Sequence, residues 1–431
     1  MSDKKKLKQI TAVAFWVTVW FIIAWIVGNP VLIASPVDTV LALAGLLGNG
    51  SFYMAVAGSV TRIMVGFLSG MVIAFVLAVM SYRYDVARTL IAPVINLCKS
   101  VPVAAFAVIL IIWWGPSNLA LIISLIIVMP VAYHNILEGI LSTDSDMLEM
   151  AKVFNMSAYN KAMFIYRNSL SPYLISSVKS GIGMSWKAGV AAEVIGMTNN
   201  SIGGQLYTSK VYFNTAEVFA LALVTVALSF LAEKLMVWLA EIILKMKVTC
   251  AGVKREDEAA SSIELSNVSK SFGKKSVYDD YSNVFEAGQK YTISTESGSG
   301  KTTLLHMIAG ILVPDSGSIK SGNVGMVFQE DRLCEEYSAV ENVTMTGTDI
   351  TVAREALSRV LDPESLDKPC KELSGGMKRR VAIVRAVEYP AGIVLMDEPF
   401  TGMDEETIAR VKAYLDDRLQ TRTVIVATHI I

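Results

Sequence analysis

Six long apolar runs occupy more than half of the first 244 residues, and no other feature limits so strongly what this chain can fold into. An α-helix needs about 20 apolar residues to cross the hydrocarbon core of a bilayer, and each run is of that order. Such runs form helices there, because every backbone polar group must be satisfied within the protein. We therefore predict membrane-spanning helices at residues 10–28, 63–82, 90–114, 119–140, 174–197 and 218–244.

The third run is the least regular of the six. Asn96, Lys99 and Pro102 interrupt it, and only the part from Val103 to Trp114 is uniformly apolar. We expect a broken or partly re-entrant segment here, which a membrane tolerates where protein or water satisfies the backbone.

Three charged side chains lie within or near the predicted spans. Lys187 and Glu193 belong to the fifth run, where ionisable groups are costly and face the bundle interior, a partner chain or water. Three explanations fit these two residues: structural pairing, a span placed closer to the membrane surface, or a role in a polar path through the membrane. Arg62 lies near a span end, where we expect its long side chain to reach the membrane surface.

The distribution of Lys and Arg over the short loops predicts the orientation. These residues occur in the first nine residues and in the loops at 83–89 and 141–173, whereas the loops at 28–38 and 115–118 contain neither. We therefore expect a cytoplasmic N-terminus. An even number of spans then returns everything after residue 245 to the cytoplasm.

Overall composition supports a membrane protein and disfavours two other classes. With 53% hydrophobic and 18% charged residues, the chain is more apolar than an average soluble protein. A formal net charge of -1 gives no general attraction to nucleic acid, so we expect no nucleic-acid partner. The four cysteines are widely separated and form no C-x-x-C pair, so we expect reduced thiols rather than a metal site or a disulfide framework.

The pattern changes after the sixth run, which predicts separate domains. We expect a transmembrane domain at 1–247, a charged linker rich in small residues at 248–262, and a soluble domain at 263–431. In the soluble part, the stretches IELSNVSKSF and QKYTIST predict strands, and KTTLLHMIAGIL predicts a helix. The expected fold is therefore multi-domain: an all-α, six-span transmembrane part followed by an α/β domain with a phosphate-binding loop.

The stretch SGSGKTT lies between a predicted strand and a predicted helix, as a phosphate-binding loop requires. Backbone N–H groups and the helix dipole hold phosphates there, and glycines permit close approach. Lys301 can reach the β- and γ-phosphates, and the Thr302 hydroxyl is placed to ligate Mg²⁺. A chance Gly/Ser loop before a helix is the plainer alternative. The predicted nucleotide-binding residues of this loop are Ser297, Gly298, Ser299, Gly300, Lys301, Thr302 and Thr303.

A second motif, GIVLMDEPF at 392–400, is an apolar strand that ends in two acids. Beside a phosphate loop, such a strand supplies Asp397 to the Mg²⁺ shell and Glu398 to the water that attacks the γ-phosphate. In isolation, a solvated turn explains the two acids equally well. Gln329 in VFQ and the stretch LSGGM lie between the two motifs in the sequence.

Taken in order, SGSGKTT, VFQ, LSGGM, LMDEP, TGMD and ATH resemble the nucleotide-binding domain of ATP-binding cassette (ABC) transporters. The resemblance implies ATP as the nucleotide and Phe272 as the aromatic residue that stacks on its adenine. It implies that Gln329 links the site to the membrane domain and that His429 senses the γ-phosphate. The catalytic residues expected in total are Glu398, His429, Gln329 and Lys301, and the expected Mg²⁺ ligands are Thr302, Gln329 and Asp397.

The same resemblance implies that the site is shared between two chains. Ser374, Gly375 and Gly376 of LSGGM would contact the ATP bound to a second copy of the domain, near Asp404. A homodimer is therefore the expected active unit.

The membrane half resembles the permeases of ABC importers. The stretch at 149–175 is similar to the cytoplasmic loop that docks on the ATPase, with Glu149, Ala151 and Pro172 at matching places. The stretches LCKSVPVAAFAVILIIWWG and GMSWKAGVAAEVIG are similar to permeases of the nitrate, sulfonate, taurine and bicarbonate branch. Fusion of permease and ATPase in one chain departs from the usual separate subunits.

Three features depart from the family pattern. Thr295 and Glu296 stand where the phosphate loop usually has glycine and proline, which adds backbone strain and a negative charge near the phosphates. Asn155 replaces the glycine of the docking loop, although Asn tolerates a left-handed backbone. The sequence also ends two residues after His429, where family members continue with a further helix and strand.

The resemblance implies ATP-driven import of a small solute across the cytoplasmic membrane, delivered by an extracytoplasmic binding protein. The solute stays open: nitrate, a sulfonate, bicarbonate and a pyrimidine precursor all fit. Two other functions remain as alternatives. An exporter would share the ATPase motifs but would normally lack the docking loop, and a regulatory or sensing membrane protein with an impaired ATPase would explain Thr295.

Overall fold

The computed structural model describes residues 2–100, 102–246, 250, 258–273, 275–294 and 299–428. They form two compact units. The helical unit contains Met1–Ser142 and Leu170–Met246, and the sheet unit contains Thr143–Ser169 and Lys247–Ile431. Residues 143–169, here called the inserted segment, thus group with the sheet unit although the predicted transmembrane domain included them. Most of the predicted linker lies outside the described residues.

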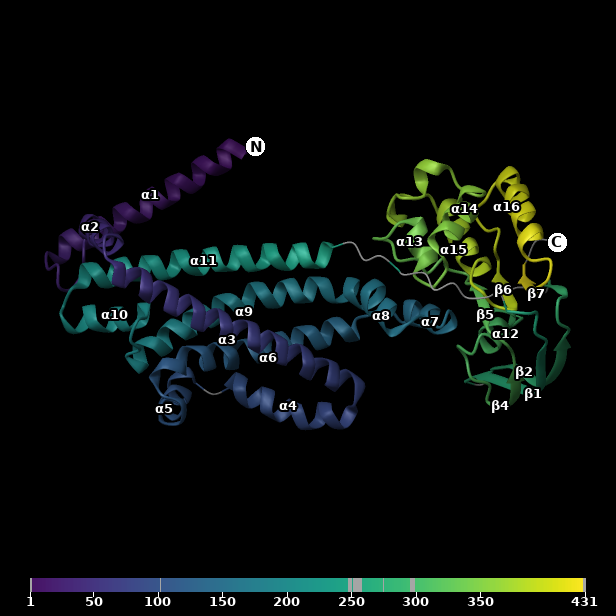
Figure 1. The fold of residues 1–431 in the computed structure, drawn as a ribbon, viewed down its shortest axis with the longest axis horizontal. Helices are drawn as coiled ribbons and strands as arrows, with labels where there is room; N and C mark the ends of the chain where they lie inside the picture. The colour runs from purple at the N-terminus through teal and green to yellow at the C-terminus, as the bar shows by residue number, and fades with distance from the viewer. Residues whose placement is uncertain are drawn as a thin grey trace. The chain divides into compact units, whose positions relative to one another are not determined.

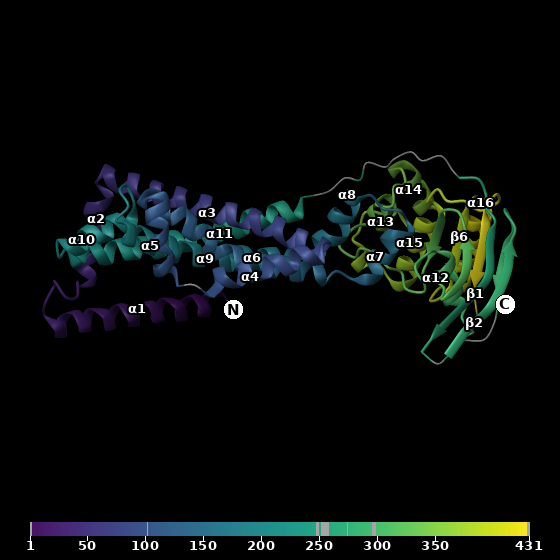
Figure 2. The same cartoon turned by 90° about the horizontal axis from the view of Figure 1, so that it is seen from below.

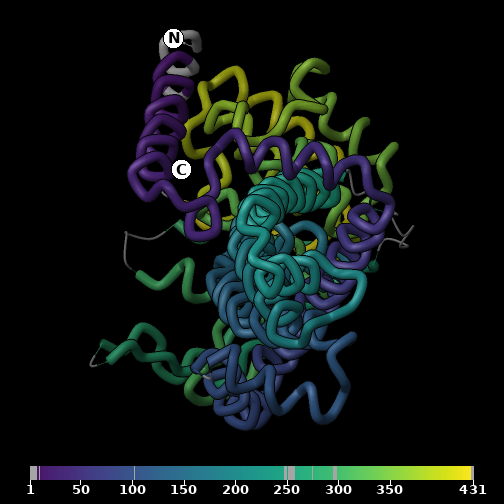
Figure 3. Tube along the Cα trace, turned by 90° about the vertical axis from the view of Figure 1, so that its left-hand side faces the viewer, coloured from purple at the N-terminus to yellow at the C-terminus, as the bar shows by residue number. Residues whose placement is uncertain are grey.

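Four helices of the helical unit, α3, α6, α9 and α11, run side by side in Figures 1 and 2. The first helix stands apart from them, as the view in Figure 3 also shows. The helices of this unit are α1 (Ser2–Val27), α2 (Pro36–Leu47), α3 (Gly50–Arg83), α4 (Asp85–Ser100), α5 (Val103–Trp114), α6 (Leu119–Leu141), α9 (Arg167–Gly196), α10 (Ile202–Val211) and α11 (Thr215–Lys245).

Among the described residues, four helical stretches are long and apolar enough to cross a membrane, in α1, α3, α6 and α11. The bent pair α4 and α5 makes a fifth span if it counts as one, and it contains the predicted break at Pro102. All but the last residue of the span predicted at 174–197 belong to α9, whose 30 residues include Lys179, Lys187 and Glu193 and are less apolar. The six-span prediction is therefore not confirmed.

Helices α3 and α6 pack closely because α3 presents glycine to its neighbour. A Cβ atom on Gly66 would lie 2.2 Å from the Leu121 carbonyl oxygen, and one on Gly70 would lie 2.3 Å from Val128 Cγ1. Small residues at such crossings let membrane helices approach and gain van der Waals contact. Helix α3 also begins at Gly50, 13 residues before the predicted span.

Glu193 is fully buried and pairs with Arg62, whose Nη2 lies 3.0 Å from Glu193 Oε1. The other Glu193 oxygen accepts hydrogen bonds from the Ser59 hydroxyl (2.6 Å) and the Gly203 N–H (3.2 Å). Arg62 Nη2 also donates to the Asn200 carbonyl oxygen (2.9 Å). Arg62 thus bridges a buried carboxylate and the loop after α9, a pairing that the sequence did not predict. Of the explanations considered for Glu193, the fold shows structural pairing.

The sheet unit contains a parallel sheet and a smaller antiparallel sheet. In the parallel sheet the strand order is β3 (Lys290–Ile293), β7 (Thr423–Ala427), β6 (Ile393–Asp397) and β5 (Val324–Val327). All residues of β5 and β6 are buried, as expected for parallel strands with covered faces. The antiparallel sheet has the order β2 (Lys275–Phe285), β1 (Ile263–Phe272) and β4 (Ser316–Lys320).

Helices fill the rest of this unit, as Figure 1 shows. They are α12 (Lys301–Ile308), α13 (Ala339–Thr344), α14 (Ile350–Ser358), α15 (Gly375–Val387) and α16 (Glu405–Arg418), together with α7 (Ser145–Val153) and α8 (Ala158–Asn160) of the inserted segment.

The inserted segment shares the hydrophobic core of the sheet unit. Phe154 is fully buried, with its ring centroid 5.1 Å from that of Tyr389 in an edge-to-face arrangement and the Arg385 guanidinium 5.3 Å from it. Asn155 then adopts φ +43°, so the chain makes at this position the left-handed turn that the family makes with glycine. The turn sends the chain from α7 toward α8 (Ala158–Asn160) while Phe154 stays in the core.

Candidate nucleotide site

Helix α12 follows strand β3, as the phosphate-loop pattern predicted. Gly300 caps this helix with φ +97°, and a Cβ atom there would come within 2.6 Å of Val277 Cγ1, so only glycine fits without strain. The Tyr278 hydroxyl donates a hydrogen bond of 3.2 Å to the Gly300 carbonyl oxygen. Strand β2 therefore supports the end of the loop.

Five of the residues singled out in the sequence fall outside the described ranges. These residues are Thr295, Glu296, Ser297 and Gly298 of the loop, and His429. Ser299 directly precedes the helix cap, and Lys301, Thr302 and Thr303 form the first turn of α12.

Two predicted Mg²⁺ ligands meet directly. The Thr302 hydroxyl donates a hydrogen bond of 2.7 Å to Asp397 Oδ2. Asp397 is the last residue of β6 and is only 2% exposed. Burial raises the pKa of the Asp397 carboxyl, and the hydrogen bond from Thr302 opposes this rise.

This pair fits Mg²⁺. The cation takes one or two protein carboxylates and completes its octahedron with phosphate and water oxygens. It would also offset the cost of the buried Asp397 charge. Within the described ranges, no group of three or more His, Cys, Asp and Glu side chains could hold a metal ion. A cation at Thr302 and Asp397 would therefore depend on the nucleotide for further ligands.

Glu398, the predicted catalytic base, lies in a strained turn directly after β6. Its φ is +47°, a left-handed value that costs a non-glycine residue about 1–3 kcal/mol. Its N–H donates to the Ala427 carbonyl oxygen at the end of β7, at 2.9 Å. Such strain persists only where the surroundings fix the backbone, and it is a feature of functional sites.

Arg379 on α15 is the residue that sequence reasoning missed. It is 3% exposed, and its guanidinium reaches the backbone on both sides of the site. Only its place in the basic stretch KRR marks it in the sequence, and that pattern is typical of a solvated helix face. Arg379 Nη2 donates to the carbonyl oxygens of Asp397 (2.6 Å) and Glu398 (2.8 Å), and Nη1 to those of Phe328 and Gln329 (3.3 Å) and to Asp331 Oδ1 (3.2 Å).

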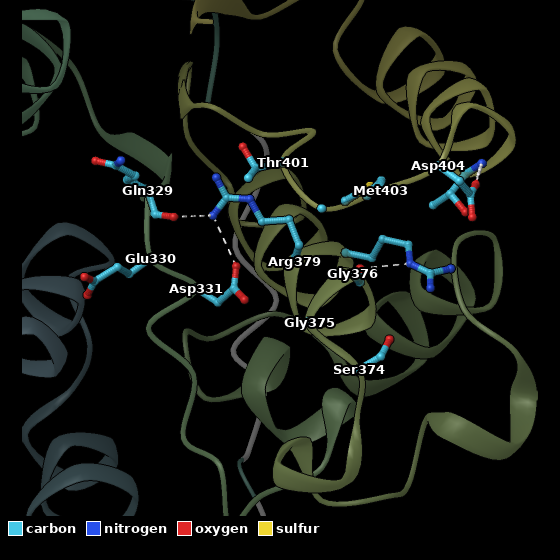
Figure 4. A pocket seen from close by; sticks show the side chains of 13 residues that line it. Gln329, Glu330, Asp331, Ser374, Gly375, Gly376, Arg379, Thr401, Met403 and Asp404 are labelled. Atoms are coloured by element: carbon cyan, nitrogen blue, oxygen red, sulfur yellow. Dashed lines mark hydrogen bonds and ion pairs between the residues drawn. The ribbon is translucent and has the colours of Figure 1, made fainter. Parts of the chain in front are cut away.

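Gln329 shares a pocket of about 750 Å³ with the LSGGM residues (Figure 4). Ser374 caps α15, with its hydroxyl accepting a hydrogen bond from the Met377 N–H at 3.3 Å. Among the described residues, Lys301 and Thr302 at the start of α12 do not line this pocket. The lining residues are Gln329, Glu330, Asp331, Ser374, Gly375, Gly376, Arg379, Arg380, Thr401, Gly402, Met403, Asp404 and Thr407.

Phe272, the predicted adenine-stacking residue, ends strand β1 and is 51% exposed. Lys270 Nζ lies 5.9 Å from the centroid of its ring. The exposed ring is available for stacking.

Within the sheet unit, the inserted segment contacts Arg332, three residues after Gln329. Arg332 Nη1 lies 2.8 Å from Glu149 Oε2, and Arg332 Nη2 lies 3.3 Å from Asp146 Oδ1. The Arg332 guanidinium also lies 4.2 Å from the centroid of the Phe328 ring. Glu149, one of the docking residues that the family resemblance implied, therefore meets the segment that carries Gln329.

Two family models match the chain. Residues 66–244 match the model described as the binding-protein-dependent transport system inner membrane component, and residues 278–401 match the model described as ABC transporter. The aliphatic sulfonates import ATP-binding protein SsuB of Delftia acidovorans is 36% identical over 179 residues, which are 39% of this chain and 74% of that protein. The chain belongs to the ABC transporters.

Other relatives match the ATPase part of the transporter. The ergothioneine transport ATP-binding protein EgtV of Helicobacter pylori is 32% identical over 33% of this chain and 76% of its own. The match to the Nod factor export ATP-binding protein I of Paraburkholderia xenovorans, at 30% identity, spans 39% of this chain and 63% of that protein, less than two thirds. A solved dimeric bacterial ABC transporter cassette is 27% identical, with a TM-score of 0.37 over 39% of this chain and 88% of the cassette.

The transporter thus combines a permease domain with an ATPase domain that binds and hydrolyses ATP. Its apolar helices make it a multi-pass membrane protein.

Proposed function

We propose that this transporter imports a small solute that an extracytoplasmic binding protein delivers. The observation that carries the proposal is the match of residues 66–244 to the inner-membrane component of binding-protein-dependent transport systems. The ATPase part alone does not decide direction, because its relatives include both a sulfonate import protein and Nod factor export proteins. The basic loops support a cytoplasmic N-terminus and a cytoplasmic ATPase domain. A sulfonate, nitrate, bicarbonate and a pyrimidine precursor remain equal candidates for the solute.

Hydrolysis is assigned to the residues around the end of β6. Thr302 and Asp397 would hold Mg²⁺, and when bound the cation offsets the charge that develops on the transferred phosphoryl group. Glu398 takes a proton from the attacking water, and its backbone, held at Ala427 and Arg379, fixes where its carboxylate lies. Gln329 orients the same water or contacts the cation. Lys301 contacts the β- and γ-phosphates, and Phe272 stacks on the adenine.

Arg332 couples these residues to the permease. The Arg332 side chain is 10% exposed and forms ion pairs with two acids of α7, and Arg332 follows Gln329 by three residues in the chain. A change in the position of Gln329 during the ATP cycle would therefore move Glu149. The inserted segment follows α6 and continues into α9, and these two helices carry the motion to the permease.

The active unit is a homodimer with each ATP held between two chains. Ser374, Gly375 and Gly376 line a pocket that the Lys301 side chain of the same chain does not reach. The LSGGM residues therefore need the phosphate loop of a second copy, as the family pattern implies. A single chain cannot complete a site.

Mixing two inactive variants tests the homodimer. We expect dimers of Lys301→Ala chains with Ser374→Arg chains to hydrolyse ATP faster than either variant alone. In the mixed dimer both lesions fall in one site, and the other site keeps an intact Lys301 and an intact Ser374. The comparison uses co-reconstituted protein separated by two affinity tags, with each variant tagged twice as the control. A purified monomer that hydrolyses ATP at the full rate would exclude this arrangement.

The direction of transport is tested in sealed proteoliposomes. A candidate extracytoplasmic binding protein is added outside, and ATP is trapped inside the vesicles. External vanadate inhibits transporters whose ATPase domains face outward. An importer should hydrolyse the trapped ATP several-fold faster when the binding protein and its solute are present, because both act from the opposite face of the membrane. Equal hydrolysis with and without the binding protein would contradict import and favour an exporter or a sensor.

A further inference from the structure

Arg379 lies where three parts of the ATPase domain meet. It belongs to α15, the helix that Ser374 caps. One edge of its guanidinium donates to the carbonyl oxygens of Asp397 and Glu398, and the other to that of Gln329. Figure 4 shows Arg379 between Gln329 and Asp331, and away from Asp404. The two backbone segments that carry the proposed hydrolytic residues are thus joined through one side chain.

We propose that Arg379 is the positioning residue that holds Gln329 and Glu398 in register with each other and with the Ser374 helix. The inference rests on the proposed roles of Gln329 and Glu398. Arg379 touches neither nucleotide nor water in this role. It acts through the backbone of the residues that do.

The geometry explains why this position needs arginine. A guanidinium is planar, always charged and offers donors in a fixed fork, whereas the ammonium group of lysine is a single point. Arg379 uses Nη1 and Nη2 toward different segments, so no single donor could replace it. Among the described acidic side chains only Asp331 forms an ion pair with it, at 3.2 Å. The carbonyl dipoles of the two backbone segments otherwise balance the buried charge of Arg379. The charge is therefore stabilised only when both segments are correctly placed.

The strained turn at Glu398 supports the same reading. A residue at φ +47° relaxes unless its neighbours hold it. The N–H of Glu398 is held by Ala427, and its carbonyl oxygen is held by Arg379 at 2.8 Å and by the Thr401 hydroxyl at 3.1 Å. Arg379 also holds the preceding carbonyl, that of Asp397, so it fixes both sides of the turn.

The neighbouring arginine shows that these contacts are specific. Arg380 donates to the carbonyl oxygens of Gly376 (3.1 Å) and Val360 (2.6 Å), so it ties α15 to a different part of the domain. Only Arg379 among the basic residues of KRR reaches Gln329 and Glu398 in the described structure.

The test uses full-length transporter with Arg379→Lys, Asp331→Asn and, as the matched control, Arg354→Gln, which removes one member of an exposed ion pair with Asp367. We expect Arg379→Lys to lower kcat by about 10-fold to 10²-fold, the range that a small misplacement of catalytic groups produces. The KM for ATP and the affinity for a fluorescent ATP analogue should stay near the parental values. The control should keep the parental kcat.

Hydrogen exchange of the nucleotide-free protein gives a readout that needs no turnover. Amides at 328–332 and 397–401 should exchange faster in Arg379→Lys, while those at 410–416 in α16 should not change. Asp331→Asn keeps the guanidinium, so it should speed exchange at 328–332 alone. Asp331→Asn keeps the proposal testable even if substitutions at Arg379 prevent folding. If Asp331→Asn sped exchange at 397–401 as much as at 328–332, the proposal would be contradicted.

A double variant separates positioning from general stability. If Arg379 acts in part through Glu398, then Arg379→Lys should slow the residual single-turnover hydrolysis of Glu398→Gln by a smaller factor than it slows that of the parental transporter. Additive losses, or faster exchange throughout the domain, would show a structural role only and overturn the proposal. If Glu398→Gln itself hydrolyses ATP at the parental rate, the proposed role of Glu398 fails, and the exchange data still report on what Arg379 holds.

Discussion

Replacing Glu398 by Gln should leave ATP binding intact and lower turnover by a factor of order 10² or more, the range of general-base catalysis. The amide has the shape of the carboxylate, and the contacts that fix this residue involve its backbone N–H and carbonyl oxygen. The turn at φ +47° should therefore survive the substitution. What is lost is the group that accepts the proton of the attacking water.

Single-turnover hydrolysis and binding of a fluorescent ATP analogue measure the two quantities separately. Glu406→Gln is the matched control, because Glu406 is an exposed acid in the first turn of α16. A parental rate in Glu398→Gln would remove Glu398 from the proposed role. A loss of binding together with turnover would instead show that the turn had collapsed.

Breaking the buried pair between Arg62 and Glu193 should destabilise the permease by about 3–5 kcal/mol. In Glu193→Gln the Arg62 guanidinium keeps its contact with the Asn200 carbonyl but loses its only carboxylate partner in the described structure. The Ser59 hydroxyl also loses a charged acceptor. Unfolding of the purified protein in detergent, followed by α-helical signal, measures the change.

Two comparisons separate the pair from ordinary surface charge. Glu241→Gln removes an exposed pair with Lys245 and should cost about 0.5 kcal/mol or less. The double change Arg62→Met with Glu193→Gln should cost less than the sum of the two single changes, because it leaves no unpaired buried charge. Additive costs would show that the two charges do not stabilise each other.

The sequence predicted contacts where a motif fixes both residue type and local structure. The strand, loop and helix around SGSGKTT place Thr302 at the start of α12, and LMDEP places Asp397 at the end of β6, so their hydrogen bond was predictable from two motifs. Parallel order puts the ends of β6 and β7 at the same edge of the sheet.

Arg379 could not be predicted in the same way. Its importance depends on which carbonyl groups lie within reach of a long side chain, and three basic residues in a row give no sign of that. The pairing of Arg62 was not predicted for a related reason, since its partner Glu193 is 131 residues away in sequence. The six-span count is not confirmed because α9 contains Lys179, Lys187 and Glu193 and is less apolar than the four helices that pass as spans.

The inserted segment has a consequence for how the chain is made. Synthesis proceeds at about 5–20 residues per second, so residues 143–169 leave the ribosome on the order of ten seconds or more before strand β6, which is more than 200 residues further along. During that interval the apolar side chains of Met150, Phe154 and Phe164 lack the core that later buries them. Nascent transporters therefore pass through an aggregation-prone stage whose duration depends on translation speed. Slow codons downstream of residue 169 would lengthen the time during which a chaperone must protect these side chains.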